Sequence, residues 1–254
     1  MLTTRMQSSN PILRSEGFQS VFQFPGSSAM SIQGTVQKTF LALMILMASA
    51  IGTALLPGQI LPGVPMNVLA IGAAVIGLVL VLITSFNPKL APVLVPAYAV
   101  VEGVFLGSVS YTYEALSPGI VMNAVLLTSA TAIAMLVSYQ TGLIQVSDTF
   151  RRVIMVATMG LCLTYVLSMV LGLFGVNIPF IYSSSPIGIG FSLLVVGLAA
   201  LNLVLDFDMV ANLAKQGAPR HMEWMGALTI LVTLVWLYLE FLRLLLKLSN
   251  SSRN

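Results

Sequence analysis

The chain has 254 residues, of which 57% are hydrophobic and only 7% are charged, and its net charge is +3. A soluble globular domain carries about a quarter charged residues, so this chain cannot cover a surface that faces water. Its few basic residues form no patch of the kind that binds nucleic acid. The single cysteine, Cys162, lies in an apolar run and excludes a disulfide framework within the chain.

The N-terminal region is rich in Ser, Gln, Gly and Pro and holds no long apolar core. We therefore expect residues 1–35 to form a flexible arm rather than a cleaved signal, and residues 36–254 to form one membrane domain. A helix needs about 20 mostly apolar residues to cross the hydrocarbon, and seven runs meet this requirement. In chain order, these runs are Thr39–Leu56, Met66–Phe86, Ala91–Thr112, Gly119–Tyr139, Val153–Phe174, Ile187–Leu205 and Trp224–Leu246.

Turn-forming residues separate most of these runs, for example at Asn87-Pro88 and at Ser117-Pro118-Gly119. Transmembrane β-strands would be shorter and would alternate polar with apolar residues, which these runs do not do. The sequence therefore predicts an all-α integral membrane protein, a seven-transmembrane-helix bundle that follows a flexible N-terminal arm.

Basic residues determine the predicted orientation, because they are enriched in cytoplasmic loops. Eight Lys and Arg precede the first run or lie in alternate loops, and the other three loops hold none. The N-terminus is therefore expected in the cytoplasm. Seven crossings place the C-terminus outside, although Arg243, Lys247 and Arg253 lie near it. The last run has neither Gly nor Pro from Ala227 to Leu248, which favours a full crossing over a re-entrant segment.

Acidic residues inside apolar runs are costly, and each is a candidate functional residue. Glu102 lies in the middle of the third run, no basic residue lies within that run, and Tyr98 is one turn before it. Gly103 and Gly107 form a small-residue face on which a neighbouring helix can pack closely. Glu102 is either an ion or proton ligand inside the bundle or a protonated acid that only hydrogen-bonds another helix.

Two aspartates end the sixth run. At about 100° per residue, Asp206 and Asp208 point to nearly opposite sides of a helix and do not form one carboxylate pair. Asn202 lies one turn before Asp206 on the same face, which directs Asp206 along a polar seam. Both aspartates are candidates for an ion pathway, but Asp208 is explained more simply as a marker of the cytoplasmic helix end.

Glu240 lies in the last run, where Arg243 can pair with it along the helix. That ion pair is the alternative to a functional role for Glu240. The chain has no phosphate-binding loop, catalytic triad or zinc ligand set. We therefore expect no enzymatic activity and no resident cofactor.

Several short motifs resemble the Bax inhibitor-1 family, whose members are also called transmembrane Bax-inhibitor-motif proteins. The motifs are Glu102-Gly103 with Leu106-Gly107, Asp206 at the end of the sixth run, and Leu237-Tyr238-Leu239-Glu240-Phe241 in the last run. The stretches Ser9-Asn10-Pro11-Ile12-Leu13, Asp206-Phe207-Asp208 and Glu223-Trp224 look like its bacterial branch. The resemblance runs from Lys38 to the end of the chain. It implies a seven-helix bundle in a bacterial inner membrane with a pH-sensitive calcium leak activity, so that Ca²⁺ or H⁺ would be a permeant or regulatory ion.

The resemblance also implies which residues gate the path, because two aspartates on the family's last two helices share a proton. Asp206 takes the first position, and Glu240 takes the second in place of the usual Asp. Both are then candidate transient Ca²⁺ ligands. Glu240 would lie roughly 24 Å from the cytoplasmic end of a straight last helix, far from Asp206 near that end. Glu102, roughly 17 Å into its own helix, is the alternative partner of Glu240.

The predicted mechanism follows from the low dielectric of the bundle, in which two neighbouring carboxyls cannot both ionise cheaply. A shared proton would join two helices, and its loss at higher pH would separate them and bare oxygen ligands for a cation such as Ca²⁺. Two other functions stay open. One is a non-conducting regulator whose arm docks on another membrane protein, such as a quality-control protease, and the other is a proton-coupled transporter. In every case the lipid bilayer is the expected partner and nucleic acid is not.

Overall fold

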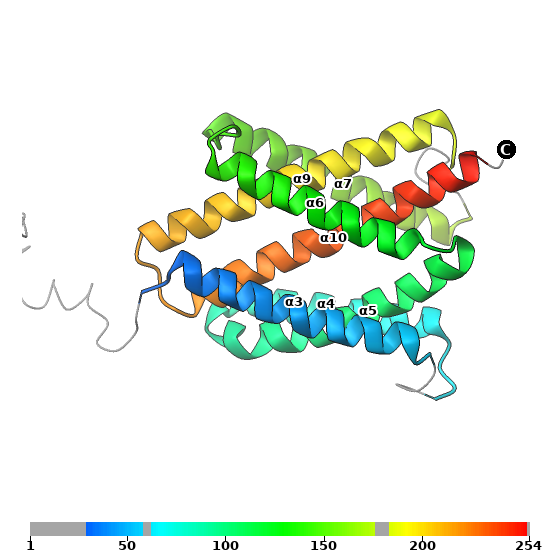
Figure 1. Cartoon of the computed structure of the whole chain (residues 1–254), viewed down its shortest axis with the longest axis horizontal. Helices are drawn as coiled ribbons and strands as arrows, with labels where there is room; N and C mark the ends of the chain where they lie inside the picture. The colour runs from blue at the N-terminus through cyan, green and yellow to red at the C-terminus, as the bar shows by residue number, and fades with distance from the viewer. Residues whose placement is uncertain (1–28, 58–61, 176–182, 253–254) are drawn as a thin grey trace, which may run out of the picture.

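The computed structural model describes residues 29–57, 62–175 and 183–252, so most of the predicted N-terminal arm lies outside the described residues. The described part is a bundle of seven long helices without a strand (Figure 1). All seven are long and apolar enough to cross a bilayer, which confirms the predicted fold class. They are α3 (Ile32–Leu55), α4 (Met66–Phe86), α5 (Ala91–Leu116), α6 (Ile120–Gln140), α7 (Asp148–Leu173), α9 (Pro186–Lys215) and α10 (Met222–Ser251), with a 3-10 turn at Pro88–Leu90.

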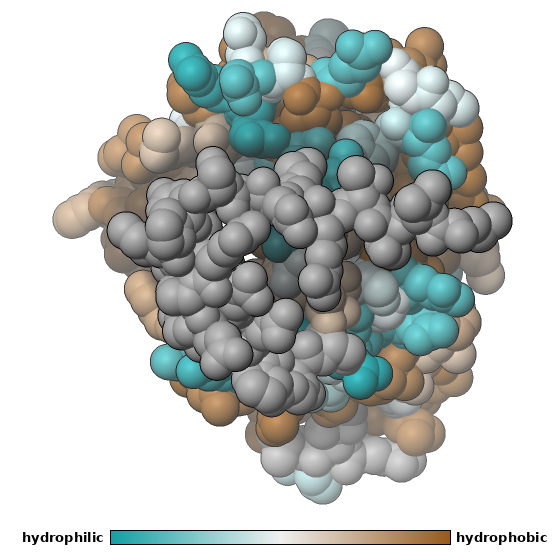
Figure 2. Space-filling model, turned by 90° about the vertical axis from the view of Figure 1, so that its left-hand side faces the viewer, coloured by the Kyte–Doolittle hydropathy of each residue, from teal (hydrophilic) through white to brown (hydrophobic). Residues whose placement is uncertain are grey.

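Successive helices run in opposite directions, so the bundle has two distinct ends (Figure 1). We call the end at which α3 and α10 begin the N-side, and the end at which α10 finishes the C-side. Hydrophilic side chains gather on the N-side, with apolar side chains around them (Figure 2). The basic residues of the described loops and of the helix turns next to them all belong to this end, namely Lys38, Lys89, Arg151, Arg152, Lys215 and Arg220.

Most helices extend beyond the apolar runs from which they were predicted. At the start of α3, the Ser31 hydroxyl accepts a hydrogen bond from the Gly34 N–H, and the helix includes the last residues assigned to the arm. At its other limit, α9 continues to Lys215. The expectation that Asp206 and Asp208 end their helix is therefore wrong. A hydropathy pattern identifies only the part of a helix that lies in the hydrocarbon of the bilayer. Capped, more polar turns can extend the same helix beyond that part.

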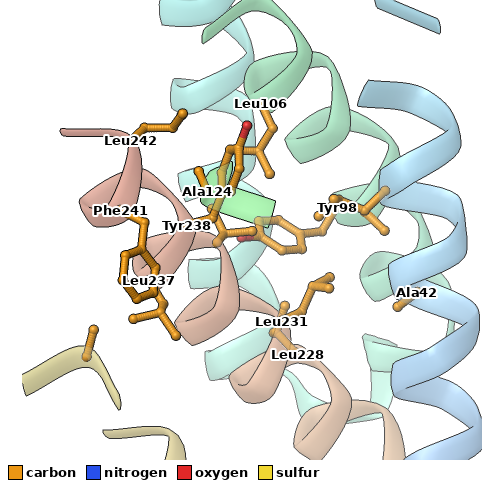
Figure 3. Packing of buried hydrophobic residues seen from close by; sticks show 14 of the residues in the cluster. Ala42, Tyr98, Leu106, Ala124, Leu228, Leu231, Leu237, Tyr238, Phe241 and Leu242 are labelled. Atoms are coloured by element: carbon orange, nitrogen blue, oxygen red, sulfur yellow. The ribbon is translucent and has the colours of Figure 1, made fainter. Parts of the chain in front are cut away.

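The last helix, α10, is the central element of the bundle. It packs against α3, α5, α6 and α9, and its fully buried side chains include Leu231, Leu237 and Leu242. Figure 3 shows buried α10 residues beside Tyr98 of α5 and Ala42 of α3, with which they form one hydrophobic cluster. The helix is continuous from Met222 to Ser251, which supports the full crossing rather than a re-entrant segment. Any polar group on the inner faces of α10 is therefore held inside the bundle.

The small-residue face of α5 packs directly against α3. A Cβ atom on Gly107 would lie 2.4 Å from the Ala50 carbonyl oxygen, and one on Gly103 would lie 2.5 Å from the Leu46 carbonyl oxygen. At the same interface the Ser49 hydroxyl donates to the Val100 carbonyl at 2.7 Å. The two glycines therefore allow the backbones to approach closely, as the sequence predicted.

Gly107→Ala is expected to lower the thermal unfolding midpoint of the detergent-solubilised protein. Overpacking against backbone costs about 1–3 kcal/mol, because a carbonyl oxygen cannot move aside as a side chain can. The matched control is Gly72→Ala in α4, where an added Cβ would meet nothing within 4 Å. Equal midpoints for the two variants would show that the α3–α5 contact is not sterically limited.

Candidate functional site

The inner face of α7 carries polar residues at a spacing of seven. Arg151, Thr158 and Tyr165 lie on one stripe of the helix because seven residues make nearly two full turns. The stripe faces α9, against which α7 packs, and Ile154 and Leu161 fill the positions between the polar residues. We call the polar contacts made by this stripe and by the facing sides of α9 and α10 the polar seam.

Asp208 forms the N-side end of the polar seam. One of its carboxyl oxygens lies 2.6 Å from an Arg151 guanidinium nitrogen and accepts a hydrogen bond from the Asn212 amide at 2.9 Å. Its other oxygen accepts a long hydrogen bond from the Tyr139 hydroxyl, at 3.4 Å. Asp208 therefore joins α6, α7 and α9 in an ion pair close to the N-side loops.

Asn202 and Asp206 leave the same face of α9 toward different helices. The Asn202 amide donates to the Thr158 hydroxyl of α7 at 2.7 Å. The half-buried Asp206 carboxyl instead accepts a hydrogen bond from the Thr233 hydroxyl of α10 at 2.6 Å. No ion pair among the described residues includes Asp206. Asp206 is thus an interior acid without a cationic partner.

Glu240 lies at the centre of a three-residue cluster near the C-side half of the polar seam. Its Oε1 atom accepts hydrogen bonds from an Arg243 guanidinium nitrogen at 2.7 Å and from the Tyr165 hydroxyl at 3.0 Å. The same Arg243 nitrogen donates to the Tyr165 oxygen at 2.7 Å, and the guanidinium carbon lies 5.2 Å from the centre of the Tyr165 ring. The i,i+3 pair that the sequence offered for Glu240 is therefore formed.

One oxygen of this cluster has no hydrogen-bond partner. Glu240 is only 2% exposed, and its Oε2 atom is the one buried side-chain nitrogen or oxygen of the described residues that lacks a partner. A buried polar atom without a hydrogen bond carries a desolvation cost of about 1–3 kcal/mol. An unpartnered carboxylate oxygen beside a resident cation is a position at which a second cation or a proton can bind.

The structure does not bring Asp206 and Glu240 together. Thr233, the partner of Asp206, precedes Glu240 by seven residues, which is about 10 Å along the axis of α10. The direct pairing of the two acids as Ca²⁺ ligands is therefore not formed in this conformation. No group of three or more His, Cys, Asp or Glu in the described part of the chain is arranged to hold a metal ion.

Glu102, the alternative partner of Glu240, lies against α4 instead. A Cβ atom on Gly77 of α4 would be 2.8 Å from the Glu102 Oε2 atom, so the absence of a side chain there makes room for the carboxyl. The carboxyl interacts with Tyr98, one turn earlier on α5. Glu102 is buried, and none of the ion pairs within the described ranges includes it. The three candidate acids therefore occupy three separate places.

Lys247 was not identified from the sequence as a site residue. Its buried amine donates to the Gly188 carbonyl at 2.9 Å and to the Ser192 hydroxyl at 2.8 Å, both near the start of α9. Arg243 and Lys247, which contradicted the charge bias of the loops, thus both bond to groups within the bundle. Arg243 and Lys247 follow Glu240 by three and seven residues, a spacing that places all three on one face of a helix. This spacing is the sequence signal that could have identified Lys247 as a site residue.

Glu223 is a third buried acid, and sequence reasoning did not identify it as a site residue. It forms an ion pair with Lys38 of α3 and accepts hydrogen bonds from the Ser31 backbone N–H at 2.9 Å and from the Ser31 hydroxyl at 3.1 Å. Next to these contacts, the Met30 N–H donates to the Ala218 carbonyl at 2.7 Å. These contacts hold the start of α3 against the start of α10. No local spacing connects residues so far apart in the chain.

Comparison with known proteins identifies the family of the chain. The sequence profile of the family described as Bax inhibitor 1 like matches residues 10–250, which include every residue of the polar seam. No curated protein and no solved structure matches the chain.

Proposed function

The chain belongs to the Bax inhibitor 1 like family, and from this premise we propose that it is a pH-sensitive cation leak channel that conducts calcium. The proposed path follows the inner faces of α7, α9 and α10. The observation that supports it is the buried Glu240 carboxyl, which is held by a tethered cation and keeps one oxygen without a hydrogen bond. The bilayer is the surrounding partner, and a bacterial inner membrane with a cytoplasmic N-side is the proposed location.

In this proposal the Arg243 side chain blocks the closed path and acts as its plug. A carboxylate in a low-dielectric interior needs a counter-charge, and Arg243 supplies it from one turn away on the same helix. The guanidinium therefore occupies the place that a permeant cation would take at Glu240. Carboxylate oxygens are suitable ligands for Ca²⁺, and Oε2 adds a second oxygen to the one that Arg243 already engages. Conduction therefore requires the Arg243 side chain to move away from the Glu240 carboxylate.

Asp206 is the proposed proton switch. While its carboxyl carries a proton, the contact with Thr233 joins α9 to α10 without a net charge. When the proton leaves, an unpaired charge remains inside the bundle, and water or a cation must enter to compensate it. The leak therefore increases as the pH rises. Asp206 and Glu240 act in succession along one path in this scheme, rather than by direct contact.

Glu102 has a secondary place in the proposal. Its carboxyl faces α4 rather than α7 or α9, so it lies outside the path along the polar seam. Asp208, which is engaged by Arg151, would anchor α7 at the mouth of the path.

The test is calcium entry into liposomes that contain the purified full-length protein or a variant without residues 1–28. The deletion stops there because Met30 and Ser31 bond to the region before and at the start of α10. We expect both proteins to conduct calcium down its gradient at equal pH on the two sides of the membrane. Absence of flux through both proteins would contradict the proposal and favour a non-conducting regulator, and loss of flux in the deletion variant alone would contradict a path formed by α7, α9 and α10. Calcium uptake that requires a proton gradient would contradict the proposal in favour of a proton-coupled transporter.

A further inference from the structure

We propose that Tyr165 is a positioning residue of the gate and that α7 is the helix that moves when the path opens. This inference rests on the proposed function and adds to it a named residue and a moving element. It starts from the three-way contact among Tyr165, Glu240 and Arg243, in which α7 reaches the charged pair on α10.

The Tyr165 hydroxyl holds both members of the ion pair at once. It donates to Glu240 Oε1 and accepts from the Arg243 guanidinium, and the Tyr165 ring lies beneath that guanidinium. The ring itself is held edge-on by Phe191 of α9, with 6.5 Å between the ring centres. Because one hydroxyl contacts both charges, its removal takes one hydrogen-bond partner from Arg243 while the charges of Arg243 and Glu240 and their direct ion pair remain.

Among the helices around the polar seam, α7 is the one least attached to the rest. It packs chiefly against α9, whereas α6 packs against α5, α9 and α10. Its outer face is apolar and exposed, for example at Val156, Met159 and Leu163. Its inner face meets α9 through the buried Ile154 and Leu161 and through a small number of polar contacts. A small outward shift of α7 is therefore inexpensive.

Such a shift has a direct consequence for Glu240. When Tyr165 withdraws with α7, Arg243 loses a hydrogen-bond acceptor and an aromatic surface, and its side chain can leave the carboxylate to a permeant cation. The other charged or titratable groups near the pair are Tyr113 of α5, beside Arg243, and Lys247 on α10 itself. Neither bridges the pair, so the coupling of α7 to the plug passes through Tyr165.

The first experiment compares calcium flux through liposomes with full-length wild type and with Tyr165→Phe. We expect the flux at acidic pH to rise roughly tenfold, the change in equilibrium that loss of a hydrogen bond to a charged group produces. The increase in flux with pH should persist, because Asp206 is unchanged. The matched control is Tyr111→Phe, which removes a tyrosine hydroxyl on the exposed surface of α5, outside the polar seam, and should behave like wild type.

A double variant separates positioning from packing. If Tyr165 acts through Arg243, Tyr165→Phe should add nothing in an Arg243→Gln background. Independent, multiplicative effects would overturn the inference, because they would mean that Tyr165 only supports packing. A wild-type response of Tyr165→Phe, together with altered flux in Arg243→Gln, would overturn it too while leaving the proposed function intact. Absence of flux in every protein would instead overturn the proposed function.

The movement of α7 can be followed independently through Cys162. It is the only cysteine of the chain, it lies on α7 and its side chain is exposed on the outer face. An environment-sensitive fluorophore on Cys162 should change its emission between acidic and alkaline pH in wild type and not in Asp206→Asn. Identical emission of labelled wild type at both pH values, in vesicles whose calcium flux does respond to pH, would exclude α7 as the moving helix.

Discussion

Replacement of Arg243 by Gln should produce a protein that leaks calcium even at acidic pH. The variant removes the tethered cation and leaves the Glu240 carboxylate buried without a counter-charge. A broken buried ion pair costs about 3–5 kcal/mol, so closed and open states should shift by at least about a hundredfold toward the state that admits water or a cation. The effect should exceed that of Tyr165→Phe, because the plug itself is absent.

The measurement is the initial rate of calcium entry into liposomes at acidic pH, where wild type is expected to be nearly closed. Arg243→Lys is the matched control, since it keeps the charge but cannot contact Glu240 and Tyr165 with the same planar geometry. It should leak more than wild type and much less than Arg243→Gln. A closed Arg243→Gln protein of normal stability would mean that the Glu240–Arg243 pair is structural only.

The second large effect is expected for Asp206→Asn, which should abolish the rise of calcium flux with pH. Asparagine is neutral at every pH and can still accept a hydrogen bond from Thr233, so it imitates the protonated aspartate. The flux should therefore stay at the acidic, closed level. The control is Asp208→Asn, which weakens the ion pair with Arg151 and should lower thermal stability while keeping the pH dependence.

The sign of this effect is informative. If Asp206→Asn were open at all pH values, the charged form of Asp206 would be the closed one, and the proposed role of Thr233 would be reversed. If Asp206→Asn and Asp208→Asn both responded to pH like wild type, the proton switch would lie elsewhere, and Glu102 would be the next candidate, as the one fully buried acid of the described residues that forms no ion pair.

The fold was largely predictable because the bilayer imposes a length on every apolar run. The range Met66–Phe86 was predicted with both of its limits, since proline precedes it and Asn87-Pro88 follows it. The C-terminal limit of α9 was not predicted, because its last turns extend beyond the apolar run and contain charged residues that a hydropathy pattern assigns to a loop. That difference placed Asp206 at a helix end in the prediction and inside a helix in the structure.

The candidate site was predictable only where its contacts are local in sequence. The Glu240–Arg243 pair follows from a spacing of three residues, and the close α3–α5 packing follows from Gly103 and Gly107. Thr233 as the partner of Asp206 and Tyr165 as the partner of Glu240 depend on which helices lie side by side. A single sequence does not contain that information, although the seven-residue spacing of Arg151, Thr158 and Tyr165 is a signal that could have indicated one shared face of α7.

The Lys38–Glu223 pair illustrates the same limit. In the sequence, Lys38 precedes the first apolar run and Glu223 precedes the last one. Only the packing of α3 on α10 makes Glu223 a buried acid. Likewise, Lys247 looked like a loop charge near the C-terminus, yet its amine bonds to the first turns of α9.

The most direct test of the account is the pH dependence of calcium entry into liposomes that contain the wild-type protein, measured against protein-free liposomes of the same lipid. The account predicts flux above the protein-free level that rises continuously from mildly acidic to mildly alkaline pH. Flux equal to that of protein-free liposomes across this range, or flux that falls as the pH rises, would contradict it.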